Sequence, residues 1–325
     1  MSKKIFRDYV DKYSIYIVLV VLIIFLSLLT PNFLTSTNMV NLLMAESARG
    51  LLAIGVAFCI IAKGIDLSLG SVVAVASVVS ASLLQNLEYG NRMFPNLPYI
   101  PVWLGVLTAL LVGVVIGAIN GGLIAYTKIP PFIATLGTTT AARGAALLYT
   151  NAYPIPELRP EFKILGQGKV GAIPNIVIVM LLFLLIAWVI LNKTRFGKNI
   201  YAIGGNIVAA KVAGIKIEKN IVMIYVWASL LAAVAGVLIT ARSGSGIASL
   251  GVGYELDGIA AATVGGCSHN GGIGRIGGIF AGILILGVIN NGLLVLGISP
   301  YIQQIVRGAV IVGAVVFDMR KANRA

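Results

Sequence analysis

Residues 221–241 of this chain read IVMIYVWASLLAAVAGVLITA, a run without a single charge. A hydrocarbon core about 30 Å thick is crossed by roughly 20 helical residues, because each residue adds about 1.5 Å. The run is therefore long enough to span a membrane as one helix. Further uncharged runs of at least that length occur at 13–45, 67–87, 93–127, 170–192 and 276–306. The sequence thus predicts a protein that crosses the membrane many times.

The overall composition supports the same fold class. The chain has 325 residues, of which 58% are apolar and 11% are charged, whereas a soluble domain carries about 25% charged residues. A transmembrane β-barrel would show alternating polar and apolar residues in segments of about ten, and these runs are continuous. We expect an all-α polytopic membrane protein with a single transmembrane domain over residues 1–325.

The positions of the excess positive charges indicate the orientation of the chain in the membrane. The chain has 24 Lys and Arg against 11 Asp and Glu, and such an excess is also found in nucleic-acid-binding proteins. Here the basic residues are clustered in short loops, which stay cytoplasmic in membrane proteins. We therefore place both termini and the 192–220 loop inside and expect no nucleic-acid partner. Sixteen basic residues then fall inside: Lys3, Lys4, Arg7, Lys12, Lys63, Lys128, Lys193, Arg195, Lys198, Lys211, Lys216, Lys219, Arg275, Arg320, Lys321 and Arg324.

About ten membrane segments follow from the apolar runs and the turn residues between them. The segments near Leu67 and Leu256 are short enough to be re-entrant rather than full spans. The predicted segments are 15–29, 39–62, 67–85, 102–126, 132–149, 176–191, 221–241, 256–266, 279–296 and 301–317.

Small residues recur at a spacing of four within one span, at Gly113, Gly117 and Gly121. Such spacing lets membrane helices approach closely. Packing is the expected role, although the same faces could also slide or line a cavity during a conformational cycle.

Charged residues inside spans are costly unless they are paired or face water. Glu46 and Arg49 are three residues apart on one helical face and can pair, whereas Arg143 and Arg307 have no partner nearby in sequence. Two interpretations remain open, namely structural pairing with snorkelling and the lining of a water-filled passage for a polar solute. The candidate path residues are Glu46, Arg49, Asn120, Arg143, Asn290 and Asn291.

Three carboxylates stand where helices are expected to begin: Asp66, Glu255 and Asp257. A carboxylate at that position accepts hydrogen bonds from free backbone N–H groups and meets the positive end of the helix dipole. We expect capping, with gating as the functional alternative.

No catalytic site can be assembled from the sequence. His269 is the single histidine and has no companion ligands, so neither a metal site nor a Ser-His-Asp arrangement is predicted. The nearest approach to a phosphate-binding loop, at 166–170, lacks the required glycine spacing and hydroxyl. We expect no enzyme activity, no cofactor bound by this chain, and no ATP hydrolysis of its own.

The 192–220 loop contains a short helix with clear end signals. Asn206 suits an N-cap, residues 207–213 form an alanine-rich helix, and Gly214 suits the C-terminal end. A capped helix exposed on the cytoplasmic side is expected to be a docking site for a partner protein. The alternative is a surface helix held by lipid headgroups through its lysines. The candidate coupling residues are Arg195, Gly197, Asn206, Ala209, Ala210, Ala213 and Gly214.

Several segments together resemble one family, the membrane permease subunits of ATP-binding-cassette sugar importers of the ribose, xylose and galactose group. The resemblance covers nearly the whole chain, and residues 91–95 and 192–205 are most similar to the galactose and methyl-galactoside members. The segments that carry it are GIDLSLG at 64–70, PFIATLGT at 131–138, the 194–215 loop, YELDGIAA at 254–261, and residues 290–308.

The resemblance implies a permease fold, a homodimer in the bacterial inner membrane, and two protein partners. One is an ATPase subunit, which holds ATP and Mg²⁺, and the other is an extracytoplasmic sugar-binding protein. The passage for a monosaccharide would then open alternately to each side of the membrane. The competing interpretation is an ion-coupled secondary transporter of a small polar solute, which needs no ATPase.

Overall fold

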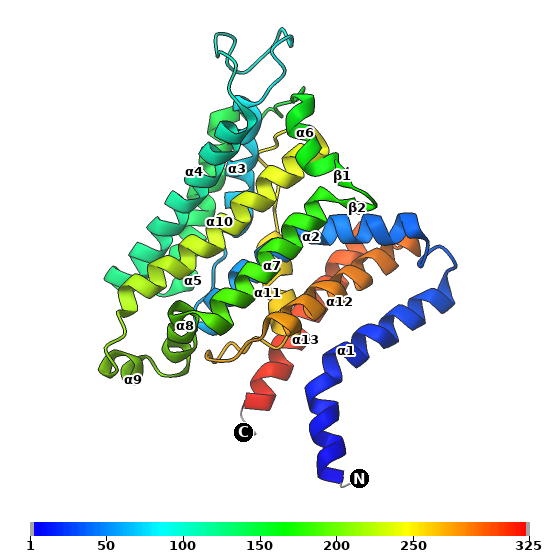
Figure 1. Ribbon diagram of the computed structural model, residues 1–325, viewed down its shortest axis with the longest axis vertical. Helices are drawn as coiled ribbons and strands as arrows, with labels where there is room; N and C mark the ends of the chain where they lie inside the picture. The colour runs from blue at the N-terminus through cyan, green and yellow to red at the C-terminus, as the bar shows by residue number, and fades with distance from the viewer. Residues whose placement is uncertain (1–2, 323–325) are drawn as a thin grey trace.

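A computed structural model describes residues 3–322 and shows an almost wholly helical chain (Figure 1). Strands in this part of the chain are confined to one antiparallel hairpin, β1 (Lys169–Val170) with β2 (Ile173–Pro174). The helices are α1 (Lys3–Leu29), α2 (Ser36–Ile61), α3 (Leu69–Leu83), α4 (Val102–Gly122), the π-helical turn η1 (Leu123–Thr127), α5 (Pro131–Thr150), α6 (Pro160–Gln167), α7 (Asn175–Lys193), α8 (Arg195–Gly205), α9 (Ile207–Val212), α10 (Ile217–Ser243), α11 (Tyr254–Val264), α12 (Ile276–Val295) and α13 (Pro300–Ala322).

Each predicted membrane segment contains a helix. The helix ends lie close to the expected ones except at the start of α1, which begins at Lys3 and not near residue 15. Within residues 3–322, five helices are long and apolar enough to cross a membrane: α2, α4 with η1, α7, α10 and α12. Shorter apolar stretches lie in α1, α3 and α13. Since α11 has only 11 residues, it is too short to cross alone, and the count of ten full spans stays a prediction.

Three elements were not anticipated. The segment after α5 contains α6 and the β1–β2 hairpin, and the basic loop begins with α8. Apolar Phe196, Ile200 and Ile203 recur at helical spacing in α8, and this pattern could have revealed the helix.

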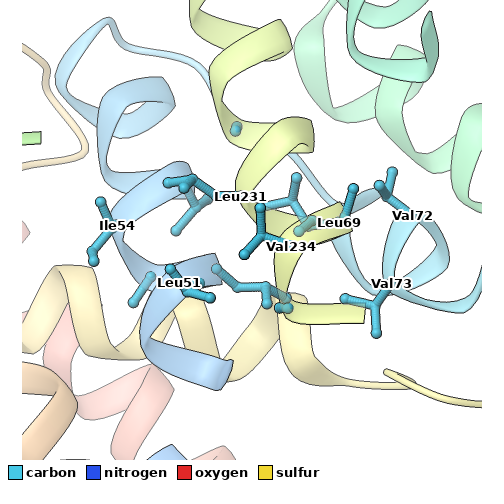
Figure 2. Close-up of a cluster of buried hydrophobic side chains, with 14 of the residues drawn as sticks. Leu51, Ile54, Leu69, Val72, Val73, Leu231 and Val234 are labelled. Carbon is cyan, nitrogen blue, oxygen red and sulfur yellow. The ribbon is translucent and has the colours of Figure 1, made fainter. Parts of the chain in front are cut away.

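The longest central element is α10, which packs against α2, α3, α4 and α6. Figure 2 shows where three of these helices meet: Leu51 and Ile54 of α2 and Leu69 of α3 lie beside Leu231 and Val234 of α10. These residues belong to one continuous apolar cluster that runs through the molecule. Burial of this kind has no hydrophobic advantage over lipid, so the fit of the side chains holds the helices together.

Glycines permit the close approach of α4 to α10, as the spacing of four predicts. A Cβ atom at Gly117 would lie 2.6 Å from the carbonyl oxygen of Tyr225, and one at Gly121 would lie 2.6 Å from Cα of Val222. Backbone atoms cannot move aside as a flexible side chain can. The glycine face of α4 is therefore a packing surface in this conformation.

The two ends of the helical bundle differ. In Figure 1, α8, α9 and the described ends of the chain lie at one end, while the 86–101 loop, α6 and the hairpin lie at the other. The large basic cluster, from Lys193 to Lys219, is thus on the same side as both described ends of the chain. This agrees with the arrangement expected from the loop charges.

A matched pair of alanine substitutions tests this packing. We expect Gly121→Ala to lower the apparent melting temperature in detergent, because the added methyl group meets backbone and overpacking costs about 1–3 kcal/mol. Gly122→Ala is the control, since a Cβ atom there has nothing within 4 Å. Equal melting temperatures for the two variants would contradict the tight α4–α10 contact.

Candidate functional site

Four charged side chains form a network between α2, α11 and α13, and we name it the four-charge network: Glu46, Arg49, Asp257 and Arg307. Arg49 Nη1 lies 2.7 Å from Glu46 Oε1, and its Nε lies 3.5 Å from Asp257 Oδ2. Arg307 Nε lies 3.1 Å from Asp257 Oδ1. Among the side chains that the structure describes, every ion pair belongs to this network. The expected Glu46–Arg49 pair is confirmed.

The network is electrically balanced and only partly shielded. Asp257 is 3% exposed, whereas the side chains of Arg49 and Arg307 are 23% and 26% exposed. The Arg49 guanidinium also lies over the ring of Tyr254, 5.3 Å from its centroid. Two positive and two negative charges avoid the cost of an unpaired charge in an apolar medium, and the exposed parts of the arginines can still meet a solute.

The expectation that Asp257 caps a helix is wrong, whereas Glu255 stands at the start of α11 as expected. The helix α11 begins at Tyr254, and its N-cap is Gly253, which has no side-chain capping bond. Asp257 is instead turned toward the two arginines of the network. Glu255 lies in the first turn, where its charge favours the helix dipole, and it acts electrostatically on Arg143.

Asp66 binds the backbone just ahead of α3. Its Oδ1 accepts a hydrogen bond of 2.9 Å from the Ser68 N–H group and one of 2.6 Å from the Ser68 hydroxyl. Asn120 Nδ2 in turn donates to Ser68 Oγ at 2.8 Å. All three side chains are fully buried, so Asn120 contacts protein here and does not line an open passage.

Arg143 fastens an irregular segment to the bundle. Its Nη1 donates to the carbonyl oxygens of Ala248 and Leu250, both at 2.7 Å, and its Nη2 donates to that of Gly70 at 3.0 Å. The 244–253 segment is thereby held against α3 and α5. These donors are occupied in this conformation, which favours a structural role for Arg143 over solute binding.

The two asparagines of α12 behave differently. Asn291 exchanges two amide hydrogen bonds with Asn38 of α2, of 2.8 and 2.9 Å. Asn290 is half-buried and makes no hydrogen bond to the described side chains or backbone. The structure therefore brings Glu46 and Arg49 together but scatters the other four candidate path residues.

The predicted docking helix is present and capped. Asn206 Oδ1 accepts hydrogen bonds of 3.0 Å from the N–H groups of Val208 and Ala209, and Gly214 has a φ angle of 80° just past the helix end. Thr194 caps α8 in the same way through the Gly197 N–H group at 3.1 Å.

The exposed side of α9 carries two valines beside Lys211, and one of the expected coupling residues, Ala210, is not part of it. Ala210 is 3% exposed and packs with Ile203 and Ile217, so it supports the helix from behind. Val208 and Val212 are 69% and 85% exposed. A partner that docks on α9 would therefore meet these valines and not Ala210.

The base of α8 is joined to the rest of the bundle through a glycine-rich loop, residues 265–275. Gly204 lies so close to Ile61 and Gly272 that a Cβ atom would clash with backbone, and Gly272 N donates to the Ile61 carbonyl at 2.8 Å. Tyr201 Oη donates to the Gly274 carbonyl at 2.8 Å. A displacement of α8 would therefore act directly on the end of α2.

The same loop is tied to α13. Asp318 Oδ2 accepts hydrogen bonds from His269 N at 3.0 Å and from Ser268 Oγ at 3.2 Å. The His269 ring nitrogen Nε2 is 2.9 Å from Thr263 Oγ1. Burial lowers the pKa of His269, and the Asp318 carboxylate opposes this shift. Among the described residues no cluster of three metal-ligating side chains occurs.

A family model described as the permease component of the branched-chain amino acid transport system matches residues 38–315. The chain belongs to this family. It is thus a permease subunit of an ATP-binding-cassette importer and not an enzyme, in agreement with the sequence motifs.

Curated relatives match over almost their full length. The galactose/methyl galactoside import permease of Escherichia coli is 42% identical over 100% of this chain and 98% of its own. The ribose import permease of Bacillus subtilis is 41% identical over 98% of this chain and 95% of its own. No solved structure matches the chain.

A double-mutant cycle tests the four-charge network. We expect Asp257→Asn and Arg307→Gln each to destabilise the protein by about 1–3 kcal/mol, because each leaves a partner unpaired. The double variant removes both charges, so it should lose less than the sum of the two single losses. The measurement is the apparent melting temperature in detergent, with the exposed Glu161→Gln as control. Strict additivity would show that the two residues do not interact.

The His269 contact predicts a small dependence of stability on pH. The folded state lowers the pKa of His269 below its ordinary value of about 6.5, so folding favours the neutral ring. Stability from this group is fully present above that value and declines as the pH falls through it. Melting temperatures at about pH 7.5 and 5.5 should differ more in the native chain than in His269→Gln. An identical difference in both proteins would contradict the prediction.

Proposed function

We propose that this permease subunit forms the passage for a monosaccharide, galactose or a related hexose or pentose. The observation that carries the proposal is the match to sugar permeases over the whole chain. The family description names branched-chain amino acids, whereas the full-length relatives are named for galactose and ribose. Identities of 42% and 41% do not separate these two sugars.

The geometry supports a mechanism driven by a separate ATPase subunit, which supplies ATP and Mg²⁺. Val208 and Val212 form an exposed apolar face at the tip of the α8–α9 unit, and this face would dock on the ATPase. The positive charge of the loops supports a cytoplasmic location, in a bacterial cell, for the α8–α9 end and both termini. The sugar-binding protein would then dock at the opposite end, near the 86–101 loop and α6.

A second permease copy fits the exposed faces of α5 and α13. Cβ atoms at Gly137, Gly144, Gly308 and Gly313 would have nothing within 4 Å, unlike the packed glycines of α4. Open glycine faces allow another helix to come close. Arg307 precedes Gly308 in α13, and the partly exposed Arg307 and Arg49 offer guanidinium donors to sugar hydroxyl groups.

Uptake by the reconstituted system tests the proposal. Liposomes that contain this chain, its ATPase and its binding protein should accumulate labelled galactose or ribose, and not leucine, when ATP is present inside the compartment that the ATPase faces. Uptake by the chain alone under an ion gradient would favour the secondary-transporter alternative. Uptake of leucine in place of the sugars would overturn the substrate class.

The docking face gives a sharper test. We expect Val212→Glu to uncouple ATP hydrolysis from uptake, because docking of the ATPase would bury an unpaired charge. The protein should remain folded in the membrane, because the Val212 side chain is exposed. Val212→Ala is the control, since it changes the same exposed position without adding a charge. Normal coupling in Val212→Glu would move the ATPase contact away from α9.

A further inference from the structure

A groove of about 340 Å³ lies behind α9, where α8 meets the start of α10. Lys216 and Lys219 line it together with the turn at Ala213 and Gly214 and the apolar Phe196 and Met223. No acidic residue is among the lining residues, and neither lysine has an ion-pair partner among the described side chains. The lining of the groove therefore carries a net positive charge, and the acidic Glu218 of the first turn of α10 is not among the lining residues.

The backbone at the groove adds to this charge. The N-cap of α10 is Lys216, which makes no side-chain capping bond, so the first N–H groups of a 27-residue helix lack a side-chain acceptor. The wall itself is fixed: Asn220 is 7% exposed, and its amide donates to the Lys216 carbonyl at 2.7 Å and accepts from Asn199 at 3.2 Å. A fixed cationic groove of this kind fits a phosphate group.

The position of the groove relative to the membrane indicates which molecule would supply the phosphate group. It lies where two membrane-crossing helices end, since α7 stops at Lys193 and α10 starts at Ile217. The Lys193 ammonium group lies 5.7 Å from the centroid of the Trp188 ring, and such pairs of an amphipathic aromatic and a lysine are typical of the membrane interface.

The groove changes from charged to apolar toward the membrane, which matches the order of headgroup and acyl chain in a lipid. Lys216, Lys219 and Met223 share one face of α10, and Met223 lies four residues, about 6 Å, beyond Lys219 toward the membrane. Met223 is 42% exposed and, with Phe196, supplies an apolar lower wall below the lysines. A soluble anion would make no favourable contact with that apolar wall, whereas the acyl chain of a lipid would pack against it.

We propose that this groove binds the headgroup of an anionic phospholipid, with the phosphate at Lys216 and Lys219 and the start of the acyl chain against Met223 and Phe196. The lipid would occupy the space behind α9 and so brace the helix from the membrane side. This site is independent of the transported solute.

Native mass spectrometry of the purified full-length chain tests the proposal. The probes are phosphatidylglycerol, phosphatidylethanolamine and inorganic phosphate, each added to delipidated protein in detergent. We expect one phosphatidylglycerol to be retained in preference to phosphatidylethanolamine. In the double variant Lys216→Gln/Lys219→Gln, the apparent affinity for phosphatidylglycerol should fall by about 30-fold. Each lysine near an anionic headgroup contributes about 1 kcal/mol.

A charge-matched control separates this site from general attraction. Lys128→Gln/Lys211→Gln also removes two exposed basic side chains and should bind phosphatidylglycerol like the native chain, while Lys219→Gln alone should show an intermediate loss. Equal loss in the control, or retention of both lipids alike, would overturn the proposal. Displacement of the lipid by millimolar phosphate would assign the groove to a free anion, and displacement by the docked ATPase would assign it to that protein.

Discussion

A hydrocarbon medium offers no hydrogen-bond partner and no screening, and the arrangement of this protein follows from that constraint. Its buried carboxylates and guanidinium groups therefore find one another or the backbone. Asp257 sits in α11, a helix too short to cross the membrane alone, and two arginines from α2 and α13 hold it there. Arg143 does the same for the irregular 244–253 segment through three carbonyl oxygens. Arginine side chains thus hold both the short helix α11 and the irregular 244–253 segment in place.

Shape complementarity supplies the rest of the cohesion. Because lipid is as apolar as leucine, association of α10 with its neighbours depends on contact distance. Gly117 and Gly121 let α4 reach the backbone of α10, and Gly55 of α2 lets Ala228 approach from another side. By contrast, the glycines of α5 and α13 meet nothing within the described chain. This difference separates a rigid centre from faces that are free to contact a second copy.

The sequence predicted the long helices well because hydrophobicity and charge are local properties of a segment. It also predicted the Glu46–Arg49 pair and the Asn206 cap, whose partners lie within four residues. It failed for Asp257, whose partners come from helices far away in the chain; an Arg307 without a local partner was the one hint. It also missed α8, since a short amphipathic helix packed under the bundle has no long apolar run. Local signals thus defined the elements, and the contacts between distant elements required the structure.

The contacts of α9 show how a displacement of this helix would reach the four-charge network. Below α9, Ala210 rests on Ile203 of α8 and Ile217 of α10, so α9 cannot move without them. The backbone contacts of Gly204 with Ile61 and Gly272 pass the displacement to α2 and the 265–275 loop, and Asp318 joins that loop to α13. Since α2 and α13 carry Arg49 and Arg307, motion at α9 would alter the spacing of the charges around Asp257. The network that stabilises this packing is therefore also placed to respond when a partner docked on α9 moves.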